Sequence, residues 1–152
     1  GWYTQYTPYQ AEISQGRLEA LLNFQTMVSD LTGFPVANSS LLDEGTAAAE
    51  AINMCINASD KKPEHPKIFL SSACHPQTIA VVRTRANALG ISIEVADISE
   101  INYSEDLTVV LLQYPDTFGN IQDYRKVISE AKSHRVMTVI AADILALTLL
   151  RN

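Results

Sequence analysis

The chain is poor in the residues from which several kinds of site are built. It has only two cysteines, Cys55 and Cys74, without CxxC spacing, so we expect buried thiols in a reducing compartment. Its eleven lysines and arginines are scattered and face seventeen acidic residues, for a formal net charge of −6, which argues against a nucleic-acid partner. No apolar run is long enough to span a bilayer, and no signal peptide is visible. These absences favour an intracellular soluble protein that binds neither nucleic acid nor membrane.

The ends of the chain lack what natural domains usually have. It opens on Gly1-Trp2-Tyr3 without a methionine and closes within the apolar run Ile144–Leu150. Because domains usually end in polar, solvated segments, we expect a piece of a longer protein.

What the chain has is an alternation of strand and helix patterns. Helical spacing or helix signals predict helices over Ile13–Leu31, Glu44–Asn57, Pro76–Leu89 and Ile121–Ser133. Apolar runs predict strands over Lys67–Ser71, Ile91–Val95, Leu107–Gln113 and Val136–Ala141. We expect an α/β domain over residues 13–152, with a mainly parallel sheet between helices, after an extended arm over residues 1–12. The segment Asp60–Pro66 is expected to be a solvated loop.

The segment Ser39–Glu50, SSLLDEGTAAAE, predicts a loop that leads into a helix. The first turn of such a helix has unpaired backbone N–H groups, and the helix dipole adds partial positive charge. Gly45 allows a close approach and Thr46 adds a hydroxyl donor, so one interpretation is a binding position for a phosphate or carboxylate. The other is an ordinary helix start capped by Asp43 or Ser40.

Two polar residues follow expected strands at their carboxyl ends, where ligands of open α/β sheets gather. His75 comes shortly after Lys67–Ser71, so it is either a helix-start residue or a ligand-facing ring. Asp143 follows Val136–Ala141 in apolar surroundings and either caps the next segment or meets a ligand. We expect no metal site, because the histidines have no cysteine or paired carboxylate at ligand spacing.

Five segments of the chain carry a family resemblance, and they are Trp2–Gly33, Ser40–Ala51, Cys74–Ala86, Gln113–Gly119 and Ala141–Arg151. In this order they resemble the first half of glycine dehydrogenase (decarboxylating), the P-protein family of the glycine cleavage system. The resemblance implies part of a fold-type-I large domain and pyridoxal phosphate (PLP) as cofactor. It also implies an enzyme that releases CO2 from glycine and passes the aminomethyl group to the lipoyl arm of the H-protein. Such an enzyme is mitochondrial in a eukaryote and cytoplasmic in a bacterium.

The resemblance also implies roles for four residues. Gly45 and Thr46 match the phosphate position, His75 the ring that stacks on the pyridine, and Asp143 the carboxylate that bonds the pyridine nitrogen. The Schiff-base lysine is missing, because no lysine of this chain follows a strand at its carboxyl end. In the family that lysine belongs to the second of two similar halves, so we expect no catalytic residue here.

Two interpretations therefore stay open. In the first, these residues shape the cofactor pocket of the parent enzyme. In the second, the chain is part of a structural half that binds no cofactor and packs its arm and first helix against the catalytic half or subunit.

Overall fold

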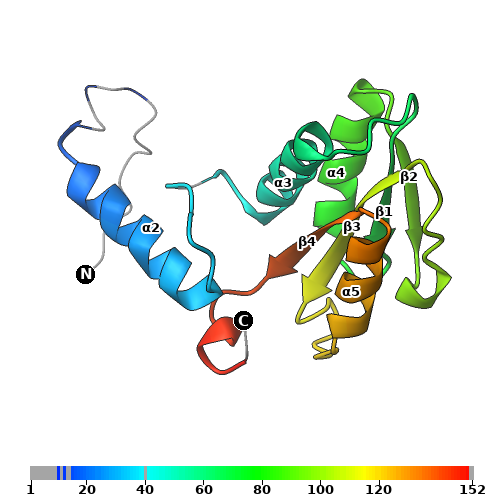
Figure 1. Ribbon diagram of the computed structural model, residues 1–152. Helices are drawn as coiled ribbons and strands as arrows, with labels where there is room; N and C mark the ends of the chain where they lie inside the picture. The colour runs from blue at the N-terminus through cyan, green and yellow to red at the C-terminus, as the bar shows by residue number, and fades with distance from the viewer. Residues whose placement is uncertain (1–9, 11, 13–14, 40, 151–152) are drawn as a thin grey trace. The chain divides into compact units, whose positions relative to one another are not determined.

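The computed structural model describes residues 10, 12, 15–39 and 41–150 (Figure 1). The chain divides into two units, residues 41–146 and residues 1–40 with 147–152. The extended arm expected over residues 1–12 lies outside the described residues, apart from Gln10 and Glu12.

The larger unit is built on a parallel sheet of four strands in the order β2-β1-β3-β4. The strands are β1 (Lys67–Ser71), β2 (Ser92–Ala96), β3 (Leu107–Tyr114) and β4 (Met137–Ala142). Each lies within one residue of the strand expected from the sequence. The uninterrupted apolar run of β3 is explained by its position, because this central strand has seven buried residues out of eight.

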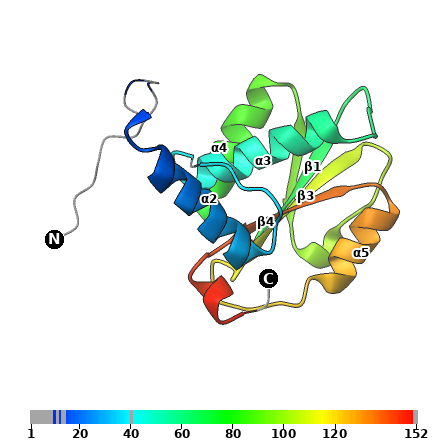
Figure 2. The same cartoon turned by 60° about the vertical axis from the view of Figure 1, so that its left-hand side comes forward.

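Helices cover both faces of this sheet (Figure 2). The helices α3 (Glu44–Ala58) and α4 (Pro76–Ala88) pack on one face, and α5 (Arg125–Ser133) packs on the other. Side chains of β1 and β3 alternate between the faces, as the pleat requires. Ile68, Leu70, Val109 and Leu111 join the α3/α4 core, whereas Phe69, Val110 and Leu112 join the core under α5. Leu107 departs from this alternation and also joins the core under α5, where the register of β3 against β1 shifts. The unit therefore has three layers, which confirms the α/β expectation.

The smaller unit contains helix α2 (Leu18–Thr32). The helix ends at Gly33, whose φ of 73° is left-handed and whose N–H donates to the Ser29 carbonyl. None of its residues is buried, and the apolar side chains of Leu18 and Leu22 are more than 60% exposed. The remaining elements among the described residues are the short helices η1 (Ile98–Glu100) and η2 (Ala146–Thr148).

Three local expectations differ from the structure. Helix α2 begins at Leu18 after a turn at Gly16 and Arg17, whereas the sequence predicted a helix from Ile13. Helix α5 begins at Arg125 and not at Ile121, and the N–H of Arg125 donates to the Asp123 carboxylate just before it. The segment Asp60–Pro66 is a loop, but it is not solvated throughout. Lys61 is only 8% exposed, and its Nζ donates to the carbonyls of Ser104 (3.1 Å) and Leu107 (2.7 Å).

Candidate functional site

The carboxyl edge of the sheet gathers the four residues singled out by the sequence. His75 follows β1 and Asp143 follows β4, so both lie beyond strand ends. Gly45 packs against Thr78 and Val81 in the first turns of α4, which begins directly after the loop that leaves β1. The N-terminus of α3 therefore lies at the same edge.

The N-terminus of α3 is capped by the chain itself. Asp43 has extended backbone geometry, and its Oδ1 accepts the N–H of Thr46 at 2.7 Å. The pKa of Asp43 lies below its ordinary value of 3.8 because the backbone N–H of Thr46, and next its hydroxyl, hydrogen-bond to the carboxylate. The backbone N–H of Thr46, a donor that a phosphate at this helix start would need, is thus used by Asp43. Glu44 adds a second carboxylate to this first turn.

Gly45 is buried, and its lack of a side chain serves helix packing. A Cβ at this position would lie 3.2 Å from Cγ2 of Val81 and 3.6 Å from the Cα of Thr78. Since 3.2 Å is tighter than ordinary van der Waals contact, glycine allows α3 to approach α4 closely.

His75 links two loops at this edge. It occupies the N-cap position of α4 without a side-chain capping bond, and its ring is exposed. The ring Nδ1 lies 2.9 Å from the hydroxyl oxygen of Thr117, and the backbone N–H of Thr117 donates to the Ala73 carbonyl at 2.9 Å. The loop after β1 is thereby tied to the loop after β3.

The loop after β3 is itself organised by a buried carboxylate, Asp116. Burial opposes its ionisation, but hydrogen bonds from the Asn120 side chain and from backbone N–H groups outweigh burial and hold the pKa of Asp116 below 3.8. This carboxylate fixes the position of Thr117 and so the partner of His75.

Asp143 continues the pairing of β4 by one residue. Its N–H donates to the Tyr114 carbonyl, and its Oδ1 accepts the N–H of Leu145, both at 2.9 Å. The side chain is exposed. Because Val139 and Ala141 pack in the α3/α4 core, alternation places Asp143 on the same face of the sheet.

A buried amide, Gln113, was not singled out by the sequence. It pairs with Ala141 in the ladder and follows Val109 and Leu111 on the α3/α4 face, one strand away from Asp143. Its side chain is 5% exposed, and Oε1 is the one buried side-chain polar atom among the described residues without a hydrogen-bond partner. The feature of the sequence that could have pointed to Gln113 is a glutamine at the end of an otherwise apolar strand.

All five lysines lie among the described residues, and none of them lies in a loop that leaves the carboxyl end of a strand. Lys61 and Lys62 precede β1, and Lys62 donates to carbonyls at the C-terminal end of α3. Lys67 begins β1 and pairs with Glu94 at 2.5 Å. Lys126 and Lys132 belong to α5. No side chain of this chain is therefore placed to bind the aldehyde of a cofactor held at the carboxyl edge.

The residues at the carboxyl edge do not by themselves form a complete binding site for PLP. The cofactor requires a position for its phosphate, a partner for its ring nitrogen and a lysine. Asp143 is of the right type for the second requirement. The Thr46 N–H is occupied by Asp43, and no lysine lies in a loop that leaves the carboxyl end of a strand. The cofactor roles of Gly45, Thr46, His75 and Asp143 stay predictions.

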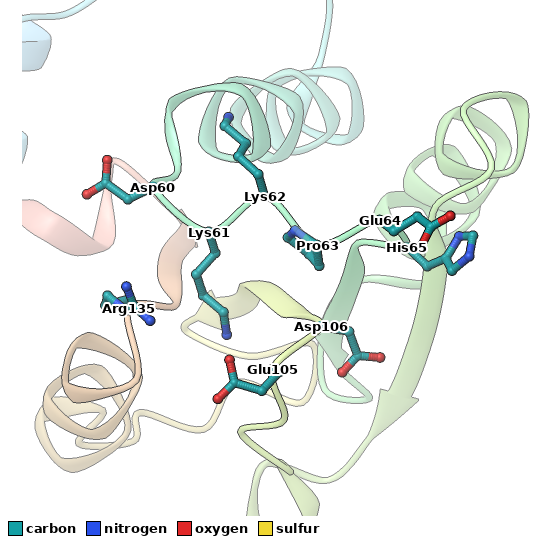
Figure 3. A pocket seen from close by; sticks show the side chains of 9 residues that line it. All are labelled: Asp60, Lys61, Lys62, Pro63, Glu64, His65, Glu105, Asp106 and Arg135. Carbon is teal, nitrogen blue, oxygen red and sulfur yellow. The ribbon is translucent and has the colours of Figure 1, made fainter.

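The opposite, amino edge of the sheet has a hollow of about 580 Å³ (Figure 3). It lies between the loops that precede β1, β3 and β4, and Figure 3 shows Lys61 pointing into it. Its other lining residues are Asp60, Lys62, Pro63, Glu64, His65, Glu105, Asp106 and Arg135. Carboxylates and cations are mixed around it, so it has no single-sign field that would select a charged ligand.

Two features are absent from the described residues. They contain no group of three or more histidine, cysteine or acidic side chains arranged to hold a metal ion. No helix in the described part of the chain has the length and apolar character needed to cross a bilayer.

Comparison with solved structures relates this fold to that of known enzymes. The inhibitor-bound glycine decarboxylase (P-protein) of the glycine cleavage system superposes with a TM-score of 0.81 at 30% identity, over 97% of this chain and 34% of that chain. A cystathionine gamma lyase from Micromonospora echinospora gives a TM-score of 0.66 at 17% identity, over 90% of this chain and 37% of the other, and shows the fold alone. The fold is that of PLP-dependent fold-type-I enzymes.

Sequence comparison is more specific. The chain is 56% identical to glycine dehydrogenase (decarboxylating) of Akkermansia muciniphila over 100% of its length, and 55% identical to the mitochondrial enzyme of Pisum sativum over 99%. It spans only 16% and 14% of these two proteins. The model of the family described as Glycine cleavage system P-protein matches residues 1–152. The chain belongs to the glycine cleavage system P-protein family.

Proposed function

We propose that this chain is part of a decarboxylating glycine dehydrogenase that uses PLP. The parent protein releases CO2 from glycine and transfers the remaining aminomethyl group to the lipoyl arm of the H-protein. PLP, when bound, withdraws electrons from the bond to the departing carboxylate. The family match over the whole chain and the names of its relatives support this proposal. A mitochondrial location in a eukaryote, or a cytoplasmic one in a bacterium, goes with it.

Within that parent, we assign the chain a structural role in the half that does not attach the cofactor. The observation that carries this assignment is the position of the five lysines, none of which lies in a loop that leaves the carboxyl end of a strand. The contacts of Thr46, His75 and Asp143 support it, because each is engaged by other residues of this chain. What these residues do is cap α3, join two loops and form the turn after β4.

The surfaces of the chain suit a protein that packs against further parts of a parent. Around the carboxyl edge, exposed apolar side chains follow β3 and β4 and precede α3. They include Leu42 (75% exposed), Phe118 (78%) and Leu145 (72%). Exposed apolar groups of this size are typical of surfaces that become buried in an assembly. The occupant we propose is the second half or subunit of the enzyme, and helix α2, which has no buried residue, offers another such surface.

A second candidate role keeps the four residues as a wall of the cofactor pocket. Their location at one edge of the sheet, where fold-type-I ligands are expected, favours it. In that role Asp143 would bond the ring nitrogen and His75 would stack on the ring.

The activity of the parent can be measured directly. Full-length protein supplied with glycine, PLP and lipoylated H-protein should release CO2 and load the lipoyl arm, and unlipoylated H-protein should not be loaded. The proposal fails if full-length protein with bound PLP leaves glycine unchanged in the presence of lipoylated H-protein.

A further inference from the structure

We propose that the Asp43 carboxylate takes, from within the chain, the place that a cofactor phosphate would take at the start of α3. This inference rests on the proposed function, because the family relation is the reason to expect a phosphate at that position. It goes beyond that function by identifying the residue that fills the position.

The contacts of Thr46 are the first support. A phosphate at a helix start binds to unpaired N–H groups and to a nearby hydroxyl. In this chain Asp43 Oδ1 accepts the Thr46 N–H at 2.7 Å. An incoming phosphate would have to displace an anion that is covalently part of the loop.

The charge of the first turn is the second support. Glu44 follows Asp43 directly, so two carboxylates lie at the positive end of the α3 dipole. Each stabilises the helix start and repels a further anion. The sequence DEGT thus combines features of a phosphate-binding turn with the charges that would exclude a phosphate.

The packing of Gly45 is the third support. A glycine in a helix start commonly signals close approach of a ligand, but here the space beside it is filled by Val81 and Thr78 of α4. The small residue is explained without any ligand. The small side chain of Gly45 and the N–H of Thr46 are therefore both explained by contacts within the chain.

A chemical-rescue experiment on the full-length parent tests this assignment. The variant Asp43→Ala removes the internal anion, and hydrogen exchange of peptides that cover residues 41–50 reports opening of the first turn. We expect exchange there to become about fivefold faster. Inorganic phosphate at constant ionic strength should then slow the exchange of Asp43→Ala back towards the wild-type rate, while leaving the wild-type rate unchanged. Asp43→Asn, which keeps an acceptor, should exchange normally without phosphate.

A matched control comes from Asp97, which caps η1 by accepting the Ser99 N–H at 2.9 Å. Asp97→Ala should speed local exchange without any response to phosphate. Because Glu44 would still repel phosphate, the rescue is repeated in Asp43→Ala/Glu44→Gln, with Glu44→Gln alone as its background. If phosphate protects neither Asp43 variant more than it protects Asp97→Ala, Asp43 is an ordinary cap and the assignment is overturned.

The outcome does not depend on the activity assay. If phosphate does not slow the exchange of Asp43→Ala, CO2 release from glycine can still be measured independently. If the full-length protein does not release CO2, the exchange measurement still reports on the start of α3. Protection of wild-type α3 by phosphate would contradict the assignment, because it would mean that the position is open.

Discussion

Replacement of Asp143 by asparagine separates a structural role from a catalytic one. In the structure, Asp143 Oδ1 accepts the Leu145 N–H at 2.9 Å, and asparagine keeps an oxygen acceptor at that position. The side chain is exposed, so we expect Asp143→Asn to change the free energy of unfolding by no more than about 0.5 kcal/mol. Asp143→Ala removes the acceptor and should cost about 1 kcal/mol, as loss of a cap does.

The kinetic expectation differs sharply between the two roles. If the carboxylate stabilised charge at a cofactor nitrogen, its loss would lower kcat by roughly 10²- to 10³-fold, the range for removal of one stabilising group. Our account expects kcat within about twofold of wild type. The assay is CO2 release from glycine by full-length protein with lipoylated H-protein, normalised to folded protein by circular dichroism. A hundredfold loss of kcat in Asp143→Asn with an unchanged unfolding midpoint would refute the reasoning and establish the second candidate role.

Three further changes test the rest of the structure in the full-length protein. Lys61→Met removes the charged donor that bonds the Ser104 and Leu107 carbonyls and should lower the free energy of unfolding by about 2–4 kcal/mol, whereas Lys62→Met, on an exposed side chain, should cost less than about 1 kcal/mol; equal losses in denaturant titrations would contradict the buried role. Gln113→Met replaces an unpartnered buried amide and should leave the melting temperature unchanged or higher, so a clear decrease would mean that another part of the parent supplies a partner. The pKa of Asp116 is lower in the folded than in the unfolded chain, so its contribution is complete above the ordinary value of 3.8 and is lost as the pH falls through the lowered value. Hydrogen exchange of residues 116–120 should therefore be independent of this group above about pH 5 and accelerate at lower pH, and Asp116→Asn should remove that acceleration.

The sheet and its covering helices follow from local patterns in the sequence. The apolar run of β3, the short strand β1 and the glycine that ends α2 all have signals that act over a few residues. Such signals predicted each strand to within one residue. They also predicted Asp43 as a possible cap of α3.

What could not be predicted depends on partners distant in the chain. The burial of Lys61 follows from carbonyls 43 and 46 residues away, whereas locally it belongs to a charged, proline-containing loop. The link between His75 and Thr117 spans 42 residues.

The location of the cofactor lysine tests the central claim most directly. Full-length protein loaded with PLP is reduced with borohydride, digested, and the modified peptide is identified by mass spectrometry. Our account predicts that the modified lysine lies outside residues 1–152 and that Lys61, Lys62, Lys67, Lys126 and Lys132 are unmodified. A stoichiometric PLP adduct on any one of these five lysines would contradict the account, because it would place cofactor attachment within this half of the enzyme.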